Sequence, residues 1–301
     1  MDSIRKQQIL EHSYADLSGG VWLRGNLHSH STRSDGAETA EVVIRNYRDR
    51  NYDFLMLSDH DVFSSKEWLE GFDPGEMILI PGNEISQNGN HILHVNANTH
   101  VQPDPERQTV FNEVAQDAES FAIVCHPNWK NDFNHTSISQ LLEWKGYSGI
   151  EVYNGVIGRL DGSPYATDKW DMLLSKGLRS WGYANDDSHR QEDTELGWNV
   201  VHVKDRSRAA IVEALREGRF YGSSGVVISA ITVDGTRIRI ETQNAERIAA
   251  VRDVGLRFAQ VDDRCIEVEV PEGAKYVRFE CWGRGEQMAW TQPFYVRNAE
   301  S

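Results

Sequence analysis

Apolar and polar residues recur along the chain with two different periods, each confined to one part of it. Between about residues 21 and 220, short apolar runs are followed by stretches with the apolar spacing of an amphipathic helix. The expected strands cover residues 21–28, 53–58, 77–85, 91–97, 121–126, 149–154 and 179–185. The expected helices cover residues 37–50, 106–119, 137–145, 165–176 and 207–217. Such repeated alternation predicts an α/β fold with a largely parallel sheet, closed or open.

The last quarter of the chain has the other period. After the Gly-rich segment 218–225, apolar residues alternate with polar ones, and turn sequences such as Asp234-Gly235 separate the runs. This pattern predicts an all-β module of about seven strands, of the sandwich type. The first twenty residues have the pattern of a short amphipathic helix that ends at Gly19-Gly20. The predicted organisation is a helical extension at 1–20, an α/β domain at 21–225 and a small all-β domain at 226–301.

Composition and charge narrow the class of protein. The 301 residues are 39% hydrophobic and 26% charged, as in an ordinary globular protein. No apolar run is long enough to cross a membrane and the N-terminal segment lacks a secretory apolar region, so we expect a soluble, cytoplasmic protein without a membrane partner. The net charge of −15 argues against binding to long nucleic acid. The three cysteines are odd in number and far apart, which excludes a disulfide framework and a CxxC zinc site.

Histidines and carboxylates recur at the downstream ends of the expected strands. These residues are His28, His30, His60, Glu84, His91, His94, His126, Asp187 and His189. In parallel α/β folds the carboxyl ends of the strands meet on one rim, where ligands bind. A His-x-His pair alone is weak evidence in a chain with 11 histidines. Imidazole and carboxylate groups from so many separate strand ends together indicate a metal site.

Five short motifs in a fixed order resemble those of a known family. They are NLHSHSTRSDG, LSDHD, GNEIS with HILH, CHP and DDSH. Over about residues 22–225 they are similar to the successive motifs of the PHP (polymerase and histidinol phosphatase) superfamily of metallohydrolases. The segments GIEVYNG, KWDMLLSKG, GYANDDSH and LREGRFYGSSG, with a β module behind them, resemble more narrowly the CehA/McbA-type branch. The resemblance implies a distorted (β/α)7 PHP barrel with two or three divalent ions at its carboxyl-terminal rim.

The resemblance also implies which residues hold the ions. His28, His30, Glu84 and Asp187 would hold the first; Glu84 would bridge to a second, completed by His94 and His126; Asp35, His60 and His189 would hold a third. His94 is preferred over His91 because the family places its ligand there, and the odd step between the two puts them on opposite faces of a strand. Asp187 is preferred over Asp186 because it makes an Asp-x-His spacing. Such ligands accept Mn, Fe or Zn.

These ligands predict a metal-dependent hydrolase. Bound cations would leave the site positively charged, which favours a small anionic substrate such as a phosphomonoester or phosphodiester. The nucleophile would be a metal-bridging hydroxide, so no side chain is assigned as a catalytic group. Arg33, Lys130 and Arg190 are candidates to bind the substrate, and Trp129 to line its pocket. The alternative is the same metal chemistry on a carboxyl ester, carbamate or amide, and a third possibility is a binding module.

Overall fold

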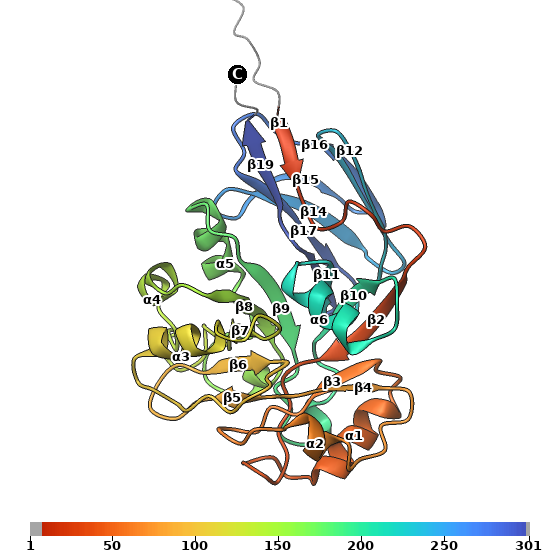
Figure 1. The fold of residues 1–301 in the computed structure, drawn as a ribbon. Helices are drawn as coiled ribbons and strands as arrows, with labels where there is room; N and C mark the ends of the chain where they lie inside the picture. The colour runs from red at the N-terminus through yellow and green to blue at the C-terminus, as the bar shows by residue number, and fades with distance from the viewer. Residues whose placement is uncertain (1–7, 299–301) are drawn as a thin grey trace, which may run out of the picture.

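The computed structural model describes residues 8–298, and strands and helices alternate through the first three quarters of the chain (Figure 1). The helices are α1 (Ala40–Arg48), α2 (Lys66–Leu69), α3 (Arg107–Val114), α4 (Ile138–Glu143), α5 (Thr167–Ser175) and α6 (Arg208–Arg216), with 3-10 turns η1 (Val156–Arg159) and η2 (Gln191–Asp193). The strands before residue 226 are β1 (Gln8–Glu11), β2 (Val21–Asn26), β3 (Phe54–Met56), β4 (Ile78–Ile80), β5 (Gly82–Ile85), β6 (Ile92–Val95), β7 (Phe121–Val124), β8 (Tyr147–Asn154), β9 (Trp181–Asn185), β10 (Trp198–Val203) and β11 (Phe220–Ser223). The mixed α/β class is confirmed.

All five predicted helices are present, each shorter than its apolar pattern. In α1 the buried residues Ala40, Val43 and Tyr47 lie on one face, as the apolar spacing predicts. In α4 the Ser137 side chain caps the first turn and Gln140 returns a bond to the Ser137 backbone, a capping box that fixes where the helix begins. Helix α2 was not predicted, because four residues are too few to show a period.

Strand pairing in this region is partly parallel and partly antiparallel. Strands β2, β3 and β4 pair in parallel, and so do β7, β8 and β9. Strand β6 runs antiparallel to both β5 and β7. Only residues 86–91 join β5 to β6, which is too short for the crossover that a parallel pair needs. The prediction of a largely parallel sheet is therefore wrong at β6, and also at β10, which runs antiparallel to both β2 and β11.

The expected strand 77–85 is divided in two at Pro81. Strand β4 pairs with β3, whereas β5 begins a five-stranded sheet in the order β5-β6-β7-β8-β9. Proline has no N–H to donate to a neighbouring strand, so the ladder stops there and the chain passes from one sheet to the other. The isolated bridge between His60 and Glu84 keeps the segment after β3 beside β5.

The two sheets meet again where β2 and β9 end. The N–H of His30 donates to the Ser188 carbonyl over 2.8 Å, and the N–H of Asp187 donates to the His28 carbonyl over 3.0 Å. These parallel contacts continue both strands beyond their regular ends. Residues 28–30 and 187–188, far apart in the sequence, therefore lie side by side.

Side-chain amides pair the free edge of β9. The Asn199 amide bonds to the N–H and the carbonyl of Ala184, and the Gln292 amide does the same for Gly182. A carboxamide presents one acceptor and two donors, so it can take the place of a neighbouring backbone. Because Gln292 comes from the end of the chain, the C-terminal strands take part in fixing β9.

Residues 226–298 contain strands and no helix, as the period-two pattern predicts. The strands are β12 (Ile228–Asp234), β13 (Arg237–Thr242), β14 (Arg247–Arg252), β15 (Leu256–Val261), β16 (Cys265–Glu269), β17 (Tyr276–Trp282), β18 (Met288–Thr291) and β19 (Phe294–Asn298). Strands β12, β13 and β16 form a small sheet of their own. Its buried residues Ile231 and Ile240 share one apolar core with Ile248 and Phe279 of the larger sheet.

The larger sheet continues across the predicted domain boundary at residue 225. Strand β11 pairs with β10 on one side and with β18 on the other, where Tyr221 lies opposite Thr291. The resulting eleven-stranded sheet contains β2, β3 and β4 as well as β14, β15, β17, β18 and β19. Of these, β14, β15 and β19 are labelled in the upper part of Figure 1. The change of pattern at residue 225 thus marks the end of the helix-containing part of the chain. The sheet itself is not interrupted there.

The predicted N-terminal helix is wrong for the residues that the structure describes. Residues 8–11 form strand β1, which pairs antiparallel with β19 so that Ile9 lies opposite Arg297. Residues 1–7 of the predicted helix lie outside the described part. The edge of β19 offers backbone partners to this segment, and such tertiary pairing overrides a weak local helix preference.

A buried ion pair joins the C-terminal strands to helix α5. The Arg278 guanidinium on β17 donates to both oxygens of Asp171 over 2.7 and 2.6 Å, and to Glu280 over 2.9 Å. The Tyr276 hydroxyl donates to Asp171 over 2.8 Å. Arg278 is only 1% exposed, so removing it would leave two buried carboxylates without their counter-charge.

Within residues 8–298, no helix is long and apolar enough to cross a membrane.

We expect Arg278→Met to lower the free energy of unfolding by about 3–5 kcal/mol, since breaking a buried pair leaves its partner charged and desolvated. Equilibrium urea unfolding measures this change. Arg247→Met, which removes an exposed pair with Asp262, is the matched control and should leave the unfolding midpoint unchanged. Equal midpoints for the two variants would contradict the role given to Arg278.

Candidate metal centre

The ends of strands from both sheets bring the predicted ligands together. His28 and His30 follow β2, Glu84 lies in β5, His126 follows β7 and Asp187 follows β9. His126 and Asp187 have positive φ angles of 27° and 56°. Non-glycine residues adopt such angles at a cost and mainly where the surrounding structure holds them, which is common at functional sites. The backbone thus turns sharply at two of the residues that face the centre.

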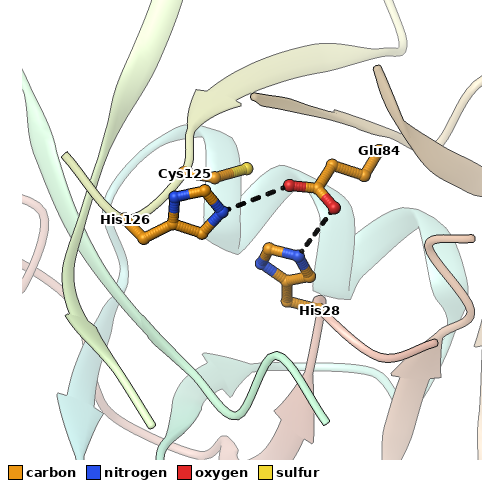
Figure 2. Close-up of side chains that lie close together, drawn as sticks. All are labelled: His28, Glu84, Cys125 and His126. Carbon is orange, nitrogen blue, oxygen red and sulfur yellow. Dashed lines mark ion pairs between the residues drawn. The ribbon is translucent and has the colours of Figure 1, made fainter. Parts of the chain in front are cut away.

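Glu84 lies at the middle of the cluster. Its Oε2 atom is 3.1 Å from His28 Nε2, 3.4 Å from His30 Nε2 and 3.0 Å from His60 Nδ1. Its Oε1 atom is 3.4 Å from His126 Nε2, on the other side. Figure 2 shows the carboxylate between His28 and His126, with each oxygen directed at one ring. One carboxylate therefore faces two groups of imidazoles, as a bridging ligand does.

Asp187 completes the inner group. Its Oδ1 atom is 3.2 Å from His28 Nε2 and 3.1 Å from His30 Nε2. The neighbouring Asp186 points elsewhere: it accepts a hydrogen bond from the Tyr47 hydroxyl over 2.7 Å and three more from backbone N–H groups. Those bonds occupy the carboxylate of Asp186, whereas the carboxylate of Asp187 faces His28 and His30.

A second group lies nearer to solvent. Asp35 is 3.4 Å from His189, 3.6 Å from His60 and 3.7 Å from His30. The Asp35 side chain is 56% exposed, whereas those of His28 and Glu84 are fully buried. Eight of the nine predicted ligands thus come together in one inner group and one outer group that share His30 and His60.

Several buried atoms in the centre have no hydrogen-bond partner among residues 8–298. They are His28 Nε2, His30 Nε2, His60 Nδ1, Glu84 Oε2 and Asp187 Oδ1. Buried polar atoms in folded proteins are nearly always paired, so a convergent set of unpaired ones needs an explanation. These atoms lie 3.0–3.4 Å from one another in the pairs given above without forming hydrogen bonds. Lone pairs that converge on a common point in this way fit a divalent cation.

The electrostatics of the centre support the same conclusion. Burial alone would raise the pKa of Glu84, but His28, His91 and His60 outweigh it and hold this pKa well below its usual value. Burial likewise opposes ionisation of Asp187, and His28 and His30 keep its pKa well below the usual value. Two fully buried carboxylates therefore stay ionised and require positive charge close to them.

The structure places His91, and not His94, beside Glu84. His91 Nδ1 is 2.9 Å from Glu84 Oε1, on the side of Glu84 that faces His126. His94 lies buried on β6 away from the cluster, and both its ring nitrogens lack partners within residues 8–298. Because the step from His91 to His94 is an odd number of residues, their side chains lie on opposite faces, as predicted. The prediction chose the wrong face, because it followed the family position and not the direction of β6.

An outer layer of carboxylates lies behind the predicted ligands, and its member Glu151 was not identified from the sequence. Glu151 on β8 bonds to His28 Nδ1 over 2.8 Å and accepts from the His126 N–H over 2.8 Å. Asp59 accepts from the Ser31 N–H over 2.7 Å and so orders the loop between His30 and Asp35. Partners of this kind fix the tautomer and direction of a ligand ring. A glutamate between the apolar residues Ile150 and Val152 of GIEVYN was the signal available in the sequence.

The three predicted substrate-binding cations lie outside the cavity above the centre. Arg33 bonds to Ser64 and the Phe63 carbonyl and stacks on Trp68 at 3.8 Å. Arg190 lies at the surface near Asp193, and Lys130 lies over the Trp129 ring at 5.5 Å. Adjacency in sequence to a ligand does not determine where a long side chain points.

A cavity of about 260 Å³ opens onto the centre. Its polar side includes Asp35, His60, His91, His126, Asp187 and His189. Its other side is apolar and is made by Trp129 from the loop after β7 and by Val156, Ile157 and Leu160 at η1. Arg159 is the one lysine or arginine among residues 8–298 that lines it. Trp129 thus lines this cavity, as does Arg159, whereas Arg33, Lys130 and Arg190 are not among its lining residues.

Two further residues near the centre were not predicted. Cys125 is fully buried and its side chain lies beside Glu84 and His126 (Figure 2). His135 packs against His91 and His126 with ring centroids 4.8 and 4.9 Å apart, and its Nε2 accepts from the His91 N–H over 3.1 Å. Both support the rings on the His126 side of Glu84.

Comparison with known proteins gives a likeness in fold. No family model and no curated protein matches the chain. A two-domain protein from Bacteroides vulgatus that contains a predicted PHP-like metal-dependent phosphoesterase matches 99% of this chain and 92% of its own, at 18% identity and a TM-score of 0.56. The chain shares the fold of that protein. The match extends over the C-terminal strands as well as the part that holds the centre.

Two further solved structures are less similar. One is a protein from Bifidobacterium adolescentis proposed to be a metal-dependent phosphoesterase, at 15% identity and a TM-score of 0.41. The other is an amidohydrolase from Chromobacterium violaceum with bound sulfate, at 18% identity and a TM-score of 0.38. Each covers 55% of this chain and 87% of its own. At these scores neither likeness adds support.

The two histidines of β6 offer a direct test. We expect His91→Ala to reduce the metal that the purified protein retains, because it removes a ring on Glu84, while His94→Ala keeps the wild-type content. Elemental analysis of both variants after gel filtration measures this, with circular dichroism to verify that each is folded. Loss of metal in His94→Ala but not in His91→Ala would restore the assignment made from the sequence.

The outer carboxylate Glu151 can be tested without disturbing a ligand. Glu151→Gln keeps the shape but weakens the bond that orients His28, so we expect metal affinity to fall about 10–100-fold. Competition with a chromophoric chelator gives the dissociation constants. Glu113→Gln, at an exposed position of α3, is the control for loss of one negative charge. Unchanged affinity in Glu151→Gln would show that His28 needs no such partner.

Proposed function

We propose that this protein is a metal-dependent phosphoesterase of the PHP type that hydrolyses a small phosphomonoester or phosphodiester. The observation that supports it is the convergence of unpaired, buried imidazole and carboxylate atoms on both sides of Glu84. The likeness to the two-domain fold agrees with it. In the same proposal, residues 21–225 form the distorted (β/α)7 barrel, and the strands after residue 225 form a sandwich-like module as in the CehA/McbA-type branch.

The ligand set accommodates two or three divalent ions of the Mn, Fe or Zn type. We assign the inner position to His28, His30, Glu84 and Asp187, and the position across Glu84 to His91 and His126. The outer position belongs to Asp35, His60 and His189. Ions bound there would act as Lewis acids toward a phosphoryl oxygen and lower the pKa of water.

The protein's own residues prepare the centre for that chemistry. Glu151 and Asp59 hold the ligand loops before substrate arrives, so little reorganisation is required during the reaction. The buried position of Glu84 and Asp187 keeps water from screening the charges in the centre. The apolar wall of the cavity limits the solvent around a bound ester.

Activity measurements test this proposal directly. Protein loaded separately with Mn²⁺, Fe²⁺ and Zn²⁺ should hydrolyse at least one member of a panel of small phosphomonoesters and phosphodiesters. Chelation should abolish turnover and re-addition of the metal should restore it, because the catalytic charge resides in the ions. Asp187→Asn is expected to lower kcat at least about 100-fold through loss of a ligand. Activity confined to carboxyl esters, carbamates or amides would replace the phosphoesterase proposal with a different hydrolase of the same centre.

A further inference from the structure

Arg159 lines the cavity, whereas Arg33, Lys130 and Arg190 do not. It ends the 3-10 turn η1, whose residues Val156 and Ile157 form part of the cavity wall. Its side chain is 37% exposed, so the guanidinium reaches both protein and open cavity. The Asp187 carboxylate is close enough to contribute to the raised pKa of Arg159, after the larger effect of the hydrogen bonds to Asp193. The guanidinium therefore lies within the electrostatic reach of the inner ligands.

Asp193 holds this guanidinium in one orientation. Arg159 Nε donates to Asp193 Oδ1 over 2.7 Å, and its terminal NH2 group donates to Oδ2 over 2.6 Å. The Asp193 side chain is only 3% exposed, and it also accepts from the N–H of the ligand His189 over 3.2 Å. Asp193 thus connects the cation to the loop of a metal ligand. Two parallel bonds to a buried carboxylate fix the plane of the guanidinium.

Donors remain on Arg159 after this pairing. A guanidinium has five N–H groups, and the Asp193 pair uses those of one edge. The other terminal nitrogen has no hydrogen-bond partner among residues 8–298 and can donate to a ligand. Because the side chain is already ordered, binding an anion through that nitrogen requires little further loss of conformational entropy. Trp129 and the 42% exposed Leu160 also line the cavity, and their largely apolar surface suits an apolar substituent.

We infer that Arg159 binds the non-bridging oxygens of the substrate anion, that Asp193 is its positioning residue, and that the substrate is an anionic ester with a compact apolar group. The inference rests on the proposed function for the reaction but not for the binding. The anion would lie between Arg159 and the ions, and the apolar group would contact Leu160 and Trp129. The cavity of about 260 Å³ limits the ligand to a small one.

Binding of phosphonates, which cannot be hydrolysed, tests the anion contact. In calorimetry on the metal-loaded protein, Arg159→Gln should weaken methylphosphonate about 10–100-fold, and Asp193→Asn about 3–10-fold. Metal content of Arg159→Gln should stay at the wild-type value, and circular dichroism verifies that the variant is folded. Arg237→Gln, an exposed arginine on β13, controls for loss of one positive charge. Unchanged affinity in Arg159→Gln, or a larger loss in Arg190→Gln, would overturn the assignment.

The apolar wall is tested by chain length. We expect butylphosphonate to bind at least about tenfold more tightly than methylphosphonate, and Leu160→Ser to reduce that ratio while leaving methylphosphonate unaffected. Leu256→Ser, at a similarly exposed leucine of β15, is the matched control. Equal affinity for the two phosphonates would exclude the apolar subsite.

These outcomes separate the two proposals. Phosphonate binding that depends on Arg159, in a protein without phosphoesterase activity, would leave this inference standing and remove the proposed function. Phosphoester turnover whose KM and kcat do not change in Arg159→Gln would do the reverse.

Discussion

The burial of Glu84 among imidazoles is the interaction on which the rest of the centre depends. An ionised carboxylate removed from water is strongly unfavourable unless positive charge and hydrogen-bond donors surround it. Here the rings come from four different segments, after β2, β3 and β7 and before β6, so each strand has to end at a fixed depth. Two features of the backbone bring β5, and with it Glu84, to the middle of the site. They are the bridge between His60 and Glu84 and the division of the strand at Pro81.

Much of the fold and most of the inner ligands could be predicted from the sequence, since both depend on local patterns. The apolar spacing of α1 and the period-two runs after residue 225 are properties of neighbouring residues, and the motifs kept His28, Glu84 and Asp187 in a recognisable order. The antiparallel course of β6 is not such a property. The antiparallel course of β6 determines that His91 faces Glu84 and His94 does not. That course depends on the pairing of β6 with both β5 and β7.

Long side chains and chain ends were predicted less well for a related reason. Arg33 and Arg190 follow ligand motifs, but their final directions depend on Trp68 and Asp193, which are distant in sequence or lie across a turn. Arg159 lies in a segment without any recognisable motif, and its importance appears only when η1 is placed against the ligand loop. Residues 8–11 form a strand because they pair with β19. The sequence pattern within those four residues does not predict this pairing.

The continuous sheet from β4 to β19 limits where this chain can be truncated or recombined with another protein. The sequence pattern suggests a domain that holds the candidate site and an appended all-β domain. Two such domains would ordinarily be expected to fold when separated. Here, cutting after residue 225 would uncover the edge of β11, remove the Gln292 amide from β9 and leave Asp171 without Arg278. Exposed strand edges invite pairing between molecules. The C-terminal strands are therefore part of the scaffold of the centre, and the chain should behave in unfolding and in recombination as one module.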